Sequence, residues 1–183
     1  MGDNFLHKAY DGGGPEDVKS FYDAWADSYE AEIHRNGYVT PERCAKALAQ
    51  YMPDKSLPIL DFGCGTGLSG LALKLAGFNT IDGVDLSAKM LKQAEAKKVY
   101  RQLTQIDGEN LPFESGTYAA LTGVGLIGPG AAPVDVIDTL MNALGPGGKL
   151  VISLNDIAIK ERIYEGRLNE YLDFGSARLL MRE

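Results

Sequence analysis

A glycine-rich turn preceded by an acid is the first group of residues whose types and spacing suggest chemistry. The segment is Asp61-Phe62-Gly63-Cys64-Gly65-Thr66-Gly67, and it closes a short apolar run that begins at Leu57. Glycine lets a ligand approach the backbone without a Cβ in the way, and it tolerates a positive φ. One glycine would suit any tight turn, whereas three at alternate positions favour a ligand-binding loop.

Two classes of ligand compete for this turn. A G-x-G-x-x-G pattern starting at Gly65 fits a dinucleotide-binding fold, with Asp85 near the distance expected for its ribose acid. Here, however, the glycines begin at Gly63 and follow an acid, Asp61, at the strand end. A carboxylate at that point disfavours a pyrophosphate and favours a cationic ligand. A nicotinamide-dependent oxidoreductase therefore stays as a weaker alternative.

Hydrophobic periodicity places the turn in an alternating series of strands and helices. One helical pattern begins at Pro15 and continues to Ile33, and a second follows the Thr40-Pro41 start to about Tyr51. Strands are predicted at 57–62, 80–85, 102–107, 118–124 and 149–154, with helices at 68–76, after 87, around 137–144 and at 157–172. This alternation predicts an α/β fold, a doubly wound, mainly parallel sheet with helices on both faces. Its ligand site should lie at the carboxyl ends of the strands.

Four segments, in order, resemble the motifs of the class I S-adenosylmethionine-dependent methyltransferases. They are Leu60-Asp61-Phe62-Gly63-Cys64-Gly65-Thr66-Gly67, Asp82-Gly83-Val84-Asp85-Leu86-Ser87, Asp107-Gly108-Glu109-Asn110-Leu111-Pro112-Phe113 and Leu144-Gly145-Pro146-Gly147-Gly148-Lys149-Leu150. The pattern is similar to the small-molecule, quinone-biosynthesis-like branch, and residues 21–30 resemble the start of the Williams–Beuren-region methyltransferase-like proteins. The resemblance implies a Rossmann-like methyltransferase sheet and S-adenosylmethionine as cofactor, with S-adenosylhomocysteine as product. It also implies in-line methyl transfer to a small-molecule acceptor.

The resemblance also assigns cofactor-binding roles to residues that follow successive strands. We expect the Asp85 carboxylate to accept hydrogen bonds from both ribose hydroxyls, and Asp107 to accept one from the adenine amino group. Asp61 is expected to reach the cofactor's ammonium, directly or through water, and Val124 to lie near the sulfonium. The aromatic stripe of the first helix either packs in the core or forms a lid. The predicted cofactor-binding residues are Tyr22, Trp25, Tyr29, Asp61, Gly63, Cys64, Gly65, Gly67, Asp85, Leu86, Met90, Asp107, Gly108 and Val124.

No catalytic side chain is assigned from the sequence. A sulfonium already carries an excellent leaving group, so the protein must mainly align the acceptor with the S–CH₃ axis and exclude water. A general base is needed only where the acceptor must first lose a proton. The two histidines, His7 and His34, and Asp156 after the fifth strand are the candidates.

Bulk properties narrow the class of protein. The length of 183 residues predicts one domain, with a flexible tail at 1–14, cap helices at 15–55 and the cofactor-binding domain at 56–183. A net charge of −7 argues against nucleic acid as a partner. The loop after the fourth strand also lacks the Asn/Asp-Pro-Pro-aromatic signature of enzymes that methylate base amino groups. Without an apolar run of membrane length or metal-ligand cysteine spacing, we expect a cytoplasmic protein with no metal.

The C-terminal part of the sheet is the main departure from the family pattern. The family sheet has seven strands, and here only Leu179-Leu180-Met181 is left to begin a sixth. The C-terminal strand pair is therefore expected to be incomplete. Its exposed edge motivates a homodimer as a hypothesis. It also motivates the alternative of a catalytically inactive cofactor-binding or partner subunit.

Overall fold

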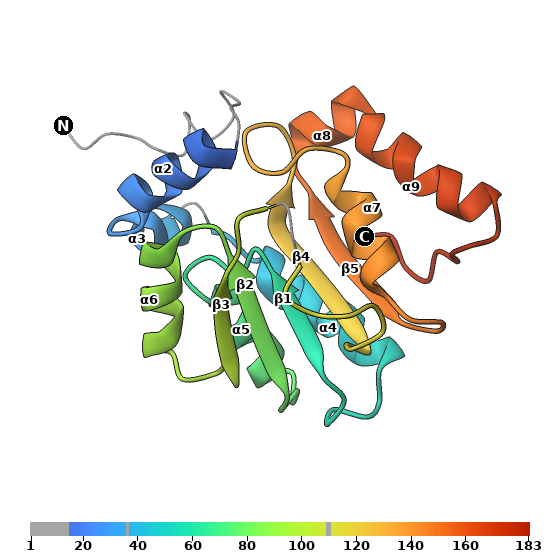
Figure 1. Ribbon diagram of the computed structural model, residues 1–183, viewed down its shortest axis with the longest axis horizontal. Helices are drawn as coiled ribbons and strands as arrows, with labels where there is room; N and C mark the ends of the chain where they lie inside the picture. The colour runs from blue at the N-terminus through green and yellow to red at the C-terminus, as the bar shows by residue number, and fades with distance from the viewer. Residues whose placement is uncertain (1–14, 36, 109–110) are drawn as a thin grey trace.

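A five-stranded parallel sheet forms the centre of the protein (Figure 1). The structure, a computed structural model, describes residues 15–35, 37–108 and 111–183. The order across the sheet is β3-β2-β1-β4-β5. The strands are β1 (Ile59–Phe62), β2 (Ile81–Asp85), β3 (Gln102–Gln105), β4 (Ala120–Ile127) and β5 (Lys149–Leu154). The direction of winding reverses between β1 and β4, so the crevice for a ligand lies at their carboxyl ends.

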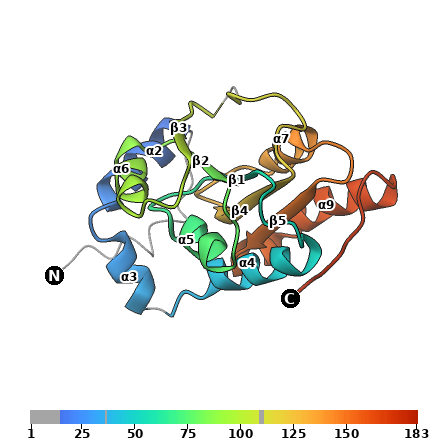
Figure 2. The same cartoon turned by 90° about the horizontal axis from the view of Figure 1, so that it is seen from below.

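Helices cover both faces of this sheet, as the two views show (Figures 1 and 2). One face packs against α4 (Thr40–Tyr51) and α5 (Leu68–Leu75). The other packs against α7 (Val136–Ala143), α8 (Asp156–Glu161) and α9 (Ile163–Asp173). α6 (Ala88–Ala96) flanks β3, and α2 (Pro15–Trp25) and α3 (Tyr29–Arg35) lie near it at one end of the molecule. The predicted α/β fold with helices on both faces is confirmed.

The central strands are apolar because both of their faces are covered. In β1, Ile59 belongs to the core beneath α4 and α5, whereas Leu60 belongs to the core beneath α7 and α9, and both are fully buried. β2 divides in the same way, with Ile81 on one face and Val84 on the other. Side chains of a strand alternate between faces, so a parallel strand covered on both sides has a nearly continuous apolar sequence.

Two helices predicted as continuous are broken in the structure. The helix expected from Pro15 to Ile33 ends at Trp25 and resumes at Tyr29, with Asp27 and Ser28 in the intervening turn. Short polar side chains of this kind compete with the backbone for hydrogen bonds and so disfavour a helix interior. The helix expected at 157–172 breaks at Arg162, whose φ of 60° is left-handed.

The C-terminal segment does not form the predicted strand at Leu179–Met181. Instead, the Tyr51 hydroxyl of α4 donates to the Leu180 carbonyl at 2.7 Å, and Arg43 of α4 lies 3.7 Å from Glu183. These side-chain contacts hold the segment beside α4 without a strand ladder, so β5 is the edge of the described sheet. The homodimer remains a prediction. None of the described helices is long and apolar enough to cross a lipid bilayer.

Candidate functional site

The glycine turn leaves β1 directly and folds back toward β2. The amides of Gly63 and Cys64 both donate to the Val84 carbonyl, at 2.9 and 3.0 Å. Gly63 has a φ of 70°, and a Cβ built on it would lie 2.7 Å from Cδ1 of Leu126. Only glycine fits this position without strain or displacement of Leu126. The turn thus keeps its backbone open to the space above the strand ends.

Asp85 ends β2 and is fixed from two sides by backbone amides. Its Oδ2 accepts from the Gly65 amide at 2.8 Å, and its Oδ1 accepts from the Ser87 amide at 2.9 Å. Burial raises the pKa of the Asp85 carboxyl, and the amides of Ser87 and Gly65 oppose that rise. Each carboxylate oxygen keeps a second lone pair for a ligand. The side chain is therefore a fixed acceptor next to the glycine turn.

Asp61 lies beneath the turn and is fully buried. Its carboxylate accepts from Ser69 Oγ at 2.5 Å, from the Tyr100 hydroxyl at 2.7 Å and from Thr122 Oγ1 at 2.9 Å. Thr122 reaches it because the register of β1 and β4 places the two residues opposite each other. Burial raises the pKa of Asp61, although the three hydroxyls oppose the rise. The structure does not bring Asp61 to a ligand surface, and Ser69 is its link to the cavity.

A cavity of about 510 Å³ lies over the carboxyl ends of β1, β2 and β4. Most of the residues predicted to bind the cofactor meet there. They are Tyr22, Tyr29, Gly63, Cys64, Gly65, Asp85, Leu86, Met90, Gly108 and Val124. Val124 lies within β4, which continues to Ile127, three residues past the predicted end of this strand at residue 124.

Four of the predicted residues do not line the cavity: Trp25, Asp61, Gly67 and Asp107. Trp25 is 2% exposed and packs edge-on against Tyr29, with ring centroids 4.7 Å apart. Gly67 is instead the residue at which α5 starts, where its φ is 90°. Asp107 is exposed to solvent beside Gly108. Residues 109–110 of the same predicted motif, and the predicted tail at 1–14, lie outside the described residues.

Other lining residues were missed by the sequence analysis. Thr66 is 1% exposed, and its Oγ1 has no hydrogen-bond partner within the part of the chain that the structure describes. Its place between two glycines of the turn was a usable signal. Tyr38 and Tyr164 also line the cavity, and neither belongs to a motif. The Tyr164 hydroxyl donates to the Ala132 carbonyl at 3.3 Å.

The half of the cavity beyond the glycine turn is largely apolar. The segment from β4 to α7 contributes Leu126, Pro129, Ala131, Ala132, Pro133 and Val136. Over the whole described lining, the charged side chains are Lys19, Asp85 and Asp135. Burial raises the pKa of the Cys64 thiol well above its ordinary value, so this sulfur is a neutral thiol.

The candidate bases predicted from the sequence do not reach this cavity in the described part of the chain. Asp156 is the first residue of α8 and is absent from the lining. His7 and the side chain of His34 lie outside the described residues. The described lining therefore holds no histidine.

The comparisons with known proteins agree with this arrangement. Residues 59–148 match the family model described as "Methyltransferase domain". Residues 59–148 therefore form a methyltransferase domain, in agreement with the class I S-adenosylmethionine-dependent methyltransferase motifs of the sequence, and S-adenosylmethionine is the methyl donor that this kind of domain uses.

Particular relatives include the human methyltransferase-like protein 27, which is 36% identical over 137 residues. The match covers 73% of this chain and 56% of that relative, so the chain spans little more than half of it. The tRNA U34 carboxymethyltransferase of Hahella chejuensis is 32% identical over 55% of this chain and 32% of its own length. Among solved structures, a SAM-dependent methyltransferase from Thermotoga maritima superimposes with a TM-score of 0.61 at 23% identity. That superposition covers 88% of this chain and 73% of the other.

Proposed function

We propose that the protein transfers a methyl group from S-adenosylmethionine to a small, largely apolar acceptor. The observation that carries the proposal is that one cavity joins two different halves. The first is polar and is built by the glycine turn and Asp85, and the second is the apolar wall between β4 and α7. A site for a charged nucleoside that opens directly onto an apolar compartment suits transfer between two bound molecules.

The residues present fit the methyl donor. Asp85 offers two carboxylate oxygens, already held by backbone amides, to the two ribose hydroxyls. Leu86 and Met90 provide an apolar surface for adenine, with Gly108 at its edge. The buried Thr66 hydroxyl offers an unused donor and acceptor to the amino-acid end above the turn. When bound, the donor supplies a methyl group on a sulfonium, with a neutral thioether as leaving group.

Around that group, this chain's own residues would bind, orient and exclude water. Tyr22 and Tyr29 close the cavity from the side of α2 and α3, and Leu126 covers the backbone of Gly63. Alignment of this kind lowers a barrier by roughly 7–11 kcal/mol in favourable cases. Because the described lining holds no histidine, we propose an acceptor whose nucleophilic atom needs no strong base. The lone pair of a neutral amine and an already ionised carboxylate both meet that requirement.

A nucleic-acid acceptor is the main rival. The Hahella relative is named as acting on a tRNA, and a yeast relative, 32% identical over 51% of this chain, is an 18S rRNA methyltransferase. The net charge of −7 and the apolar wall favour a small molecule, since phosphate backbones are bound mainly through basic surfaces.

Two measurements test the proposal in sequence. Calorimetry with S-adenosylhomocysteine and with NAD should give binding of the first alone. The protein is then incubated with S-[methyl-³H]-adenosylmethionine and a cell extract that is divided into untreated and ribonuclease-treated portions. We expect label in an organic-solvent extract of both portions. Label that is lost with ribonuclease would assign an RNA acceptor, and binding of NAD alone would remove the methyltransferase assignment.

A further inference from the structure

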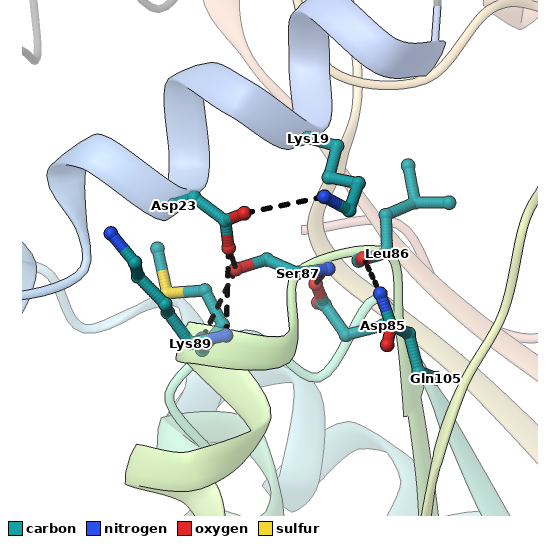
Figure 3. A network of polar contacts seen from close by, with 8 residues as sticks. Lys19, Asp23, Asp85, Leu86, Ser87, Lys89 and Gln105 are labelled. Carbon is teal, nitrogen blue, oxygen red and sulfur yellow. Dashed lines mark hydrogen bonds and ion pairs between the residues drawn. The ribbon is translucent and has the colours of Figure 1, made fainter.

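The two N-terminal helices are tied to α6 and to its N-cap residue, Ser87, by polar contacts. Asp23 of α2 accepts a hydrogen bond from the Ser87 hydroxyl and lies 3.5 Å from the Lys89 amide, as Figure 3 shows. Gln93 of α6 donates through Nε2 to the Ala26 carbonyl at 2.7 Å. Lys89 and Gln93 are four residues apart, so these contacts lie along one side of α6.

A further contact is made by Lys97, just after α6. Its ammonium pairs with Glu30 of α3 and also donates to the Thr66 carbonyl at 2.7 Å. Thr66 belongs to the glycine turn. One side chain therefore joins the N-terminal helices to the backbone of the turn.

Ser87 is the point at which three parts of the site meet. The residue is fully buried. Its Oγ accepts from the Met90 amide at 3.1 Å, which caps α6, and donates to Asp23. Its own amide donates to Oδ1 of Asp85 at 2.9 Å. The position of Asp23 is thus connected, through one serine, to the carboxylate that ends β2.

The helices held by these contacts are themselves a wall of the cavity. α2 contributes Val18, Lys19 and Tyr22, and α3 contributes Tyr29. We call residues 15–35 the lid. Hydrogen bonds and an ion pair from Asp23, Ala26 and Glu30 of the lid reach residues 87–97. Loss of these contacts would remove polar ties between the lid and the region of α6, while the aromatic side chains of the lid stay packed against one another.

We propose that Asp23 and Lys97 are positioning residues that latch the lid, so that closing the lid and fixing Asp85 and the glycine turn are one coupled event. Asp23 acts through Ser87, and Lys97 acts through Thr66. The inference rests on the proposed function, because the ligand that should bind more tightly with the lid closed is S-adenosylmethionine. By thermodynamic linkage, a ligand that binds only when the lid is closed has a lower affinity when the contacts of Asp23 and Lys97 are removed. Its binding, in turn, shifts the lid toward the closed conformation.

The local electrostatics agree with this arrangement. The Ser87 hydroxyl is the largest influence lowering the pKa of Asp23, which keeps this carboxyl ionised at neutral pH. The carboxylate also lies near the N-terminus of α6, a nine-residue helix, where the helix dipole favours negative charge. Lys19, on the same helix as Asp23, lies 3.4 Å from it and faces the cavity.

The chain's single tryptophan makes the lid observable without an assay of methyl transfer. Trp25 is 2% exposed and lies within the lid, packed between Tyr22 and Tyr29. Acrylamide quenching of its fluorescence therefore reports lid opening, and calorimetry with S-adenosylhomocysteine reports the coupled affinity. For Asp23→Ala we expect greater quenching of the free protein and an affinity about tenfold weaker. Glu16→Ala is the matched control, because Glu16 is an exposed acid of the same helix with no hydrogen bond or ion pair to the described residues.

A double-mutant cycle separates the latch from the cap of α6. Ser87→Ala alone removes both. The latch is therefore measured by comparing the effect of Asp23→Ala in the Ser87→Ala background with its effect in the wild type. We expect a clearly smaller effect in that background, where the Lys89 amide is the partner of Asp23 that remains on α6. Lys97→Met independently removes the contacts of the Lys97 ammonium with Glu30 and the Thr66 carbonyl, and it should also increase quenching of Trp25 fluorescence. Thermal unfolding shows whether each variant is folded. If the wild type binds S-adenosylhomocysteine and Asp23→Ala matches it in affinity and quenching, the latch is wrong. If the wild type does not bind this ligand at all, the proposed function fails, and quenching of the free variants alone decides the latch.

Discussion

The two halves of the cavity are built by different means. Around the glycine turn, position is set by short hydrogen bonds, such as those from Gly65 and Ser87 to Asp85. Beyond it, the wall from β4 to α7 is made mainly of proline, alanine and glycine residues in a loop, and the Tyr164 hydroxyl donates to the Ala132 carbonyl. The first half is a rigid polar framework on strand ends, whereas the second is an apolar surface on a loop.

This difference indicates which half defines the family and which half distinguishes its members. A polar ligand requires fixed partners, and these come from residue types at defined positions in the chain. An apolar wall requires only shape, which many sequences can provide. We therefore expect changes in the first half to alter affinity for the donor, and changes in the second to alter only the choice of acceptor.

The largest effect is expected for Asp85→Ala. Removal of the carboxylate deletes two charge-assisted hydrogen bonds to the ribose and should weaken S-adenosylhomocysteine binding by about a hundredfold, or about 2.7 kcal/mol. Titration calorimetry measures it. Asp135→Ala removes the acid of the other half and should leave this affinity within a factor of about two. Equal losses of affinity in Asp85→Ala and Asp135→Ala would show that the two halves of the cavity do not differ in this respect.

A smaller effect is expected where backbone shape alone is changed. In Gly63→Ala the new Cβ would meet Leu126 at 2.7 Å, and the residue would keep a φ of 70°. The free energy of unfolding should fall by about 1–2 kcal/mol, measured by urea denaturation. Gly166→Ala is the control, since Gly166 lies in α9 with nothing within 4 Å of its Cβ position. That change should raise stability by about 0.5–1 kcal/mol, and a similar gain at Gly63 would contradict the steric argument.

Acidification should weaken donor binding before an ordinary aspartate would titrate. Burial raises the pKa of Asp85 above 3.8, so the folded, ligand-free protein takes up this proton at a higher pH than the unfolded chain. As the pH falls, protonation of Asp85 removes the free-energy cost of burying its charged form. The same protonation removes the carboxylate that accepts hydrogen bonds from the ribose. The affinity for S-adenosylhomocysteine should decline with a midpoint above pH 3.8. Asp85→Asn should bind weakly and show a flatter profile, because the carboxyl that takes up the proton is gone.

The polar half could be predicted from the sequence because its signals are local. Gly63 follows β1 and Asp85 ends β2, and a parallel sheet brings the carboxyl ends of its strands together. The inward direction of Asp61 could not be predicted in this way. It depends on Ser69, the second residue of α5, and on Tyr100, which precedes β3. Such a hydrogen-bonded cluster is a consequence of packing and leaves no periodic pattern.

The apolar half of the cavity and the breaks in the predicted helices were the least predictable features, for a related reason. Tyr38 and Tyr164 come from segments far from any motif, and only the folded arrangement of α8, α9 and the loop after β4 brings Tyr164 to Ala132. The break at Arg162 places a non-glycine residue at positive φ, which propensity disfavours. Tertiary packing overrides local preference at such points, whereas β1, β4 and β5 follow apolar runs that a helix packed on the sheet would bury.

The smallest effect on the donor, and the sharpest test of the comparison, is expected for Ala131→Phe. Ala131 lines the apolar half, and a phenyl ring there occupies space that the acceptor needs while leaving Asp85 and the glycine turn unchanged. Affinity for S-adenosylhomocysteine should stay within a factor of about two, since the variant touches none of the donor's polar partners. Transfer of label to the acceptor found in cell extract should fall by at least about tenfold, because misalignment of the reacting groups is costly. A variant that loses both donor binding and transfer would mean that the two halves are one site, and a variant that loses neither would place the acceptor away from the loop between β4 and α7.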